Sequence, residues 1–138
     1  MKIGITGTRY GMNQIQRTNV SDVLVQIMNE CKLLNETAEF HHGDCVGVDV
    51  EAAAIAKELG YVIVCHPPSS NDLRGNFYYD ATHEPTNHFA RNRRIVDHTD
   101  ALLVVPLQDT HQKRGGTWYT HDYAVKVDKP LFVFYPKG

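Results

Sequence analysis

Residues 2–6, Lys2-Ile3-Gly4-Ile5-Thr6, form a short, largely apolar run that leads into the glycine-rich turn Gly7-Thr8-Arg9-Tyr10-Gly11. Such a run, bounded by glycine, is typical of a buried strand. The same order returns at Ala38–His42, which leads into Gly43-Asp44-Cys45-Val46-Gly47-Val48-Asp49 and then into apolar residues at helical spacing. A strand, a glycine turn and a helix in this order are the repeating unit of an α/β domain.

Further elements follow from the apolar spacing outside these two stretches. Strands are expected at residues 61–65, 101–105 and 131–135, and helices at residues 20–34 (capped by Ser21), 48–59, 86 or 87 to 98, and 117–127. Strands that alternate with helices imply right-handed crossovers and a mostly parallel, doubly wound sheet. The sequence therefore predicts one Rossmann-like α/β domain over residues 1–138, with a five-stranded sheet.

One stretch, His66–Pro85, fits neither pattern. It contains Pro67-Pro68, Ser69-Ser70-Asn71-Asp72 and Gly75-Asn76, all of which favour turns. A loop of about 20 residues is uncommon in a compact domain and is often functional. We expect this stretch to close over a ligand as a lid.

Charge and cysteine content narrow the partners and the compartment. The chain has 14 Lys and Arg against 16 Asp and Glu, and this lack of basic excess argues against nucleic acid as the main partner. No apolar run approaches the roughly 20 residues that span a bilayer, and no signal-peptide pattern is present. Cys31, Cys45 and Cys65 are scattered, which fits reduced thiols in the cytoplasm. We expect a cytoplasmic protein without membrane contacts.

Glycine-rich turns follow three of the predicted strands, and ligands of doubly wound sheets bind at the carboxyl ends of strands. Backbone amides at glycine turns and helix starts, with hydroxyl and guanidinium groups, suit phosphate oxygens. Aspartates of the second turn can accept hydrogen bonds from ribose hydroxyls. The candidate ligand-binding residues are Gly7, Thr8, Arg9, Gly43, Asp44, Gly47, Asp49, Arg91, Arg94, Gly115, Gly116 and Thr117.

Each of these positions also has a purely structural interpretation. The first turn matches neither G-x-G-x-x-G nor the P-loop pattern, so it can be a tight turn with a surface arginine. Asp49 can instead favour the positive end of a helix dipole. Arg91, Arg93 and Arg94 lie near a predicted helix start, where positive charge is unfavourable unless an anion is close. Helical spacing places Arg91 and Arg94 on neighbouring sides and turns Arg93 away, although all three could form a solvated face.

Other conspicuous residues carry less weight. His41-His42-Gly43-Asp44-Cys45 and Cys65-His66 lack zinc spacing, so neither a metal site nor a cofactor is predicted. Tyr78, Tyr79 and Trp118 could stack on a base or pack locally.

Four stretches together resemble a known superfamily. In order, GITGTR (residues 4–9), HHGDCVGVD (41–49), ARNRRIVDHTDALLVVP (90–106) and RGGTWYTHDYAVKVDKPLFVFY (114–135) look like the SLOG superfamily, which includes DprA/Smf-like and LOG-like proteins. The resemblance covers nearly the whole chain. It implies a Rossmann-like sheet with a nucleotide-derived ligand held by the Gly-Thr-Arg, Gly-Asp and Gly-Gly-Thr loops.

The chain departs from the LOG-type phosphoribohydrolases at one decisive position. Their Pro-Gly-Gly-x-Gly-Thr-x-x-Glu motif corresponds to Gly115-Gly116-Thr117, and the position three beyond the threonine is Thr120. Without the glutamate, cleavage of an N-glycosidic bond loses its obvious acid/base group. The remaining candidates for that role are Asp44, Asp49 and Asp122, none of which has the matching spacing.

The preferred hypothesis is a binder of a nucleotide or nucleotide-derived small molecule, of the ADP-ribose or cyclic nucleotide kind, acting as a sensor or sequestering module. The first alternative is a phosphoribohydrolase-like or other nucleotide-processing hydrolase or transferase. The second is a single-stranded DNA binder, as among DprA-like proteins. Self-association into a homo-oligomer is also expected, because related folds often pair through helices.

Overall fold

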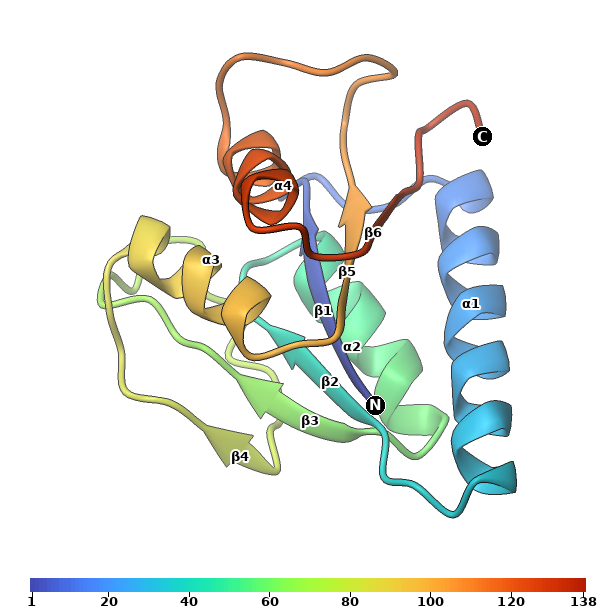
Figure 1. Ribbon diagram of the computed structural model, residues 1–138. Helices are drawn as coiled ribbons and strands as arrows, with labels where there is room; N and C mark the ends of the chain where they lie inside the picture. The colour runs from blue at the N-terminus through green and yellow to red at the C-terminus, as the bar shows by residue number, and fades with distance from the viewer.

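The computed structural model describes residues 1–138 and confirms the α/β fold with a parallel sheet (Figure 1). In chain order the elements are β1 (Lys2–Gly7), α1 (Gln14–Leu33), β2 (Glu39–His42), α2 (Val48–Glu58), β3 (Val62–Cys65), β4 (Ala81–Thr82), α3 (His88–Asp97), β5 (Ala101–Val105), α4 (Gly116–Lys126) and β6 (Leu131–Val133). The strand order is β4-β3-β2-β1-β5-β6, and every pair is parallel. The order of the strands reverses between β1 and β5, which is where such sheets bind ligands.

Helices cover both faces of the sheet (Figure 1). α1 and α2 pack on one face in a core of 17 buried residues that includes Phe40 and Leu103. α3 and α4 pack on the other face, where Leu102 and Val104 belong to a smaller cluster. Since successive side chains of a strand point to opposite faces, β5 supplies both clusters and all of its residues are buried. None of the helices combines the length and apolar character needed to cross a membrane.

The sheet has six strands where the sequence predicts five. The additional strand, β4, is two residues long and pairs with β3 inside the stretch expected to be a loop. Ala81 and Thr82 are both exposed, so no apolar pattern marks this strand. β6 ends at Val133, two residues earlier than predicted.

α1 begins at Gln14, and Ser21, the expected N-cap, lies inside the helix. Asn13 is the N-cap: its side chain accepts from the amide of Gln16, and the Gln16 side chain accepts from the amide of Asn13. Gln16 is buried, and its Nε2 donates to the carbonyl of Pro106 at 2.8 Å. Polar contacts therefore stabilise the first turns of α1, and apolar spacing cannot reveal them.

The segment 66–85 is anchored to the loop after β2. The Asp44 carboxylate accepts from the Arg74 guanidinium at 2.9 and 3.1 Å, and from the amides of Asn76 and Phe77 at 3.0 and 2.8 Å. Together with the β3–β4 pairing, these bonds fix the segment against the sheet edge. The expected lid is therefore tied down at its middle.

Candidate functional site

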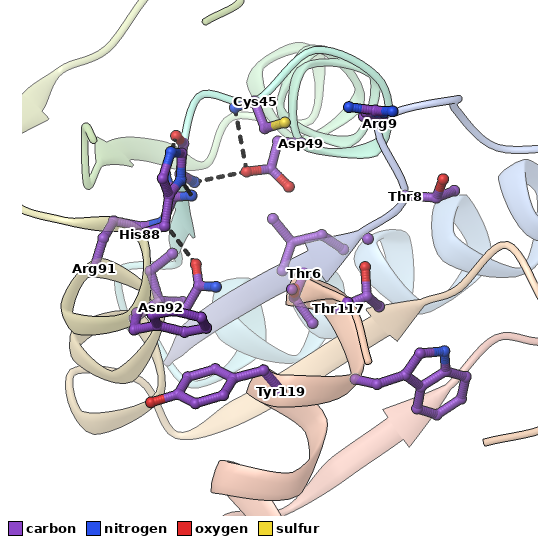
Figure 2. A pocket seen from close by; sticks show the side chains of 18 of the residues that line it. Thr6, Thr8, Arg9, Cys45, Asp49, His88, Arg91, Asn92, Thr117 and Tyr119 are labelled. Atoms are coloured by element: carbon purple, nitrogen blue, oxygen red, sulfur yellow. Dashed lines mark hydrogen bonds between the residues drawn. The ribbon is translucent and has the colours of Figure 1, made fainter. Parts of the chain in front are cut away.

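The main pocket lies at the carboxyl ends of β1, β2 and β5, where the strand order reverses. It has a volume of about 1220 Å³, and α3 and α4 form its walls with the loops that follow these strands (Figure 2). Most of the sequence candidates line it, namely Gly7, Thr8, Arg9, Gly43, Asp44, Asp49, Arg91, Gly115, Gly116 and Thr117. Gly47 and Arg94 lie outside the pocket lining.

The first loop, residues 7–11 after β1, packs closely against α2. A Cβ on Gly7 would lie 2.4 Å from Cγ1 of Val48, so only glycine permits this approach. The Thr8 carbonyl accepts from the amide of Val48 at 3.1 Å, which fixes the loop at the start of α2. Arg9 is exposed, donates to the hydroxyl of Tyr10 at 2.9 Å and forms no ion pair. The loop therefore presents an unneutralised cation at the pocket.

The second loop is held in place by its own aspartate. Asp44 adopts a positive φ of 57°, and its side chain is almost fully buried. Because its carboxylate already accepts bonds from the segment 66–85, this residue positions the loop. A Cβ on Gly47 would lie 2.4 Å from the carbonyl of Arg9, so this glycine lets the first and second loops meet. Its contribution to the site is indirect.

Asp49 is the aspartate whose carboxylate is directed into the pocket (Figure 2). Its Oδ2 accepts from the amides of Gly43 at 2.8 Å and Cys45 at 3.4 Å. Burial raises the pKa of Asp49 to about 6, although Arg91 and the two amides favour the charged form. This carboxyl group is therefore partly protonated near pH 6. Burial also raises the pKa of the Cys45 thiol to about 11, so this thiol is protonated at neutral pH.

Arg91 connects α3 to the second loop. It is buried, its Nη1 donates to the carbonyl of Gly43 at 2.5 Å, and its Nε donates to the side chain of Asn92 at 2.6 Å. A Cβ on Gly43 would meet this guanidinium at 2.4 Å, so the glycine makes room for it. The arginine therefore places a buried positive charge below the pocket.

The other two arginines of α3 have the reverse of the expected orientations. α3 is ten residues long, so Arg94 falls in its last turn, where a positive charge is favourable without a bound anion. Arg94 faces away from the pocket and its Nε donates to Nδ1 of His66 at 3.0 Å. Arg93 lines the pocket and donates to the hydroxyl of Tyr119 at 2.6 Å.

The loop between β5 and α4 leaves the N-terminus of α4 open toward the pocket. Its N-cap, Gly115, has a φ of 105° and makes no side-chain cap. The first backbone amides of a helix have no partner within the helix, and here they belong to Gly116, Thr117 and Trp118. A glycine-rich, uncapped helix start beside a pocket is a favourable place for an anion.

The pocket is basic although the chain is not. Six lysines and arginines line it against four aspartates, whereas the whole chain has a net charge of −2. Sequence reasoning missed most of this set, which comprises Arg9, Arg91, Arg93, Lys113, Arg114 and Lys126. Overall charge cannot reveal such a concentration, because most of the 16 acidic residues lie outside the pocket.

An aromatic pair was also missed. Phe89 and Tyr119, from α3 and α4, line the pocket with ring centroids 4.6 Å apart. Phe89 is 56% exposed, which is unusual for a phenylalanine on a packed helix. The only signal in the sequence was a phenylalanine among polar residues of the predicted helix, which did not indicate a partner 30 residues away.

No protein-family model and no curated protein sequence matches the chain. Solved structures do. The molybdenum cofactor binding protein of the phototrophic bacterium Rippkaea orientalis is 21% identical with a TM-score of 0.69, and the match covers 96% of this chain and 74% of that one. The molybdenum cofactor carrier protein of Chlamydomonas reinhardtii is 20% identical with a TM-score of 0.64, covering 96% and 74%.

DNA processing protein A of Helicobacter pylori, described by its single-stranded DNA binding mode, is 18% identical with a TM-score of 0.64. That match covers 96% of this chain but 64% of the Helicobacter protein, so the chain lacks a counterpart for about a third of it. Together with the strand order and the loop positions, these likenesses decide the fold. The chain shares the Rossmann-like α/β fold of these solved structures.

The position that corresponds to the LOG-type glutamate is occupied inside the fold by Thr120. Thr120 is buried, and its hydroxyl donates to the carbonyl of Gly116 at 2.8 Å inside α4. Asp122 lies at the pocket, but its Oδ1 is within 2.8 Å of ring nitrogens of both His111 and His121. Among the candidates for acid/base chemistry, Asp49 combines a pKa raised by burial with a position in the pocket.

Proposed function

We propose that the pocket binds a phosphate-bearing nucleotide or nucleotide-derived small molecule, and that the protein acts as a sensor or a sequestering module for it. The observation that carries the proposal is the uncapped N-terminus of α4, where Gly115, Gly116 and Thr117 face the pocket. Free amides and the helix dipole together favour phosphate at this point. Arg9 supplies a cation that no acidic side chain neutralises.

The aromatic pair supports a planar group on the same ligand. Phe89 and Tyr119 stand on the α3 and α4 walls, and the exposed face of Phe89 can stack on a base. Two of the solved neighbours are described as binding or carrying molybdenum cofactor, which supports a small-molecule ligand for this pocket. The pocket volume of about 1220 Å³ exceeds the roughly 300–1,000 Å³ of common small-molecule sites, which leaves room for an ADP-ribose-sized ligand.

Thermal unfolding against a panel tests the proposal. The panel contains AMP, ADP, ADP-ribose, NAD, cyclic dinucleotides, a pterin phosphate and a short single-stranded DNA. A ligand at about 100 times its Kd adds roughly 2.7 kcal/mol of stability, which is several degrees in Tm. A shift with a small nucleotide or pterin phosphate is expected. A shift with DNA alone would contradict the proposal and favour the DprA-like alternative.

Two variants then locate the ligand. Arg9→Gln should weaken binding about ten- to a hundredfold, because a hydrogen bond to a charged group contributes about 1.5–3 kcal/mol. Phe89→Ala should weaken it about tenfold through lost stacking. Arg17→Gln is the matched control, since Arg17 pairs with Glu51 outside the pocket. Equal affinity in Arg9→Gln and in the control would refute the placement of the phosphate.

A second candidate function rests on Asp49. A carboxyl group with a pKa of about 6, directed into a ligand pocket, is suited to general acid/base catalysis near neutral pH. If the protein hydrolyses a nucleotide bond, Asp49→Asn should abolish turnover while ligand binding remains. Asp72→Asn, at the pocket edge, is the control. Absence of product with the ligand that binds, at high protein concentration, would exclude this function.

A further inference from the structure

Three potential metal donors converge beside the pocket, on the loop between β5 and α4 and on α4 itself. His111 lies on the loop, and His121 and Asp122 lie on the helix. Nε2 of His111 and Nδ1 of His121 are each 2.8 Å from the same oxygen, Oδ1 of Asp122. All three donor atoms lie within 4.8 Å of one another. The sequence spacing did not predict this group, because one donor comes from a separate loop.

The arrangement is close to the geometry of a metal site. Zinc bonds to nitrogen and oxygen of about 2.0–2.1 Å at tetrahedral angles place neighbouring donors about 3.3–3.4 Å apart. The two nitrogen-to-oxygen distances of 2.8 Å would therefore widen by only about 0.5 Å. The other ring nitrogens of His111 and His121 have no protein partner, so each can carry the proton when the first nitrogen binds a metal.

Packing already holds the two imidazoles in place. The ring of Trp118 lies 5.0 Å from that of His111 and 5.2 Å from that of His121, both in edge-to-face contact. The Trp118 indole itself is buried and fixed by a hydrogen bond to Gln108 at 3.0 Å. The donors therefore need little additional ordering to bind an ion.

A second group of histidines is a poorer metal site. His41, His66 and His83 also bring ring nitrogens within 4.8 Å of one another. However, the Arg94 guanidinium donates to Nδ1 of His66, so the proton of the neutral ring sits on Nε2 and is directed at His41. The rings of His66 and His83 are stacked at 14°, which aims their lone pairs along parallel planes and not at one point.

We propose that His111, His121 and Asp122 bind a divalent transition-metal ion of the zinc class. Two imidazoles and one carboxylate match the donor preference of Zn²⁺, and three protein ligands leave a position for water or a ligand atom. The ion fixes the β5–α4 loop against α4. Lys113 and Arg114 of that loop line the pocket, so metal binding orders part of the basic wall.

Calorimetric titration of metal-free, untagged protein with Zn²⁺ tests the site without any nucleotide ligand. One ion should bind per chain, and His111→Ala and Asp122→Asn should each weaken it at least tenfold, since loss of even an outer-shell partner costs about 10–100-fold. His88→Ala, which removes an exposed histidine that belongs to neither group, should leave the affinity within twofold. Binding that survives His111→Ala and is lost in His83→Ala would overturn the proposal in favour of the other histidine group.

Limited digestion with trypsin gives an independent readout. Lys113 and Arg114 are cleavage sites within the loop that the ion would fix. Zn²⁺ should slow cleavage after these two residues in the parent protein, and Mg²⁺ should not. The protection should disappear in the His111→Ala variant. This variant should keep its fold, because the His111 side chain is exposed. Equal cleavage rates with and without Zn²⁺ in the parent protein would refute the clamping role.

Discussion

Replacing Asp49 by asparagine should make the protein more stable at neutral pH. An acid whose pKa is higher in the folded protein than in the unfolded chain holds its proton more tightly when folded. The pKa of Asp49 rises from 3.8 to about 6, with burial as the main cause. As the pH increases from about 4 to 6, the unfolded chain therefore ionises first and the folded state loses stability. Above pH 6 this loss is complete.

The size of the effect follows from the two pKa values. The two values differ by about 2, and a difference of one in pKa corresponds to about 1.36 kcal/mol. The ionised Asp49 therefore lowers the free energy of unfolding by about 3 kcal/mol at pH 7. Asparagine removes the charge, and its oxygen can still accept from the amide of Gly43, 2.8 Å from Oδ2 in the parent protein. We expect Asp49→Asn to gain between about 1 and 3 kcal/mol at pH 7.5.

Urea unfolding of both proteins between pH 4 and 8 measures this gain. The difference between them isolates Asp49, because other titrating groups contribute equally to each protein. The difference should be small near pH 4 and grow until about pH 6, with Asp72→Asn as an exposed control near zero throughout. A variant that is less stable than the parent at pH 7.5, or a difference that does not change with pH, would refute the reasoning.

Three further outcomes are expected. Asp44→Asn should lower the free energy of unfolding by about 3 kcal/mol, because breaking its buried ion pair leaves Arg74 without a counter-charge. It should also speed proteolysis within residues 66–85, and unchanged proteolysis would mean that Asp44 does not anchor this segment. Gly7→Ala should lower the free energy of unfolding by about 1–3 kcal/mol, because the added Cβ would lie 2.4 Å from Val48. Gly116→Ala should leave stability unchanged, because its added Cβ would have no contact closer than 3.8 Å. Equal urea midpoints for the two variants would contradict this reasoning. Burial lowers the pKa of His42 to about 4, so protons bind the unfolded chain first and the protein loses stability as the pH falls from 6.5 toward 4. His42→Asn should make this loss of stability smaller. An unchanged dependence of stability on pH in acid titrations would contradict this reasoning.

The fold could be predicted from the sequence because its main signals are local. Most of the five expected strands are short, largely apolar runs beside a glycine turn or a helix. β4 was missed because Ala81 and Thr82 are exposed, and its pairing depends on a segment that Asp44 holds from a distance. The start of α1 was missed because buried Gln16 satisfies its polar atoms through tertiary contacts.

The site could be predicted as a location and not as a set of contacts. Topology alone brings the loops after β1, β2 and β5 to one edge. Which side chain faces the pocket depends on the length of the helix and on tertiary contacts. Arg93, which was expected to point away, lines the pocket, whereas Arg94, which was expected there, contacts His66. Asp44 was assigned to a ligand, although its carboxylate accepts bonds from the segment 66–85. Such contacts between distant segments leave no pattern in the sequence.

The helix caps support the proposed anion site at the start of α4. α1 and α3 begin with Asn13 and Asn87, whose side chains accept from the helix amides. α2, α3 and α4 all begin beside the pocket, but only α2 and α4 have glycine N-caps, Gly47 and Gly115, and no side-chain cap. A glycine cap costs only a few tenths of a kcal/mol relative to asparagine, but it leaves the amides open. At α2 a carbonyl from the first loop takes one of these amides, whereas at α4 no protein group covers them. An anion bound at the start of α4, as we propose, would complete hydrogen bonding that the chain satisfies internally at α1 and α3.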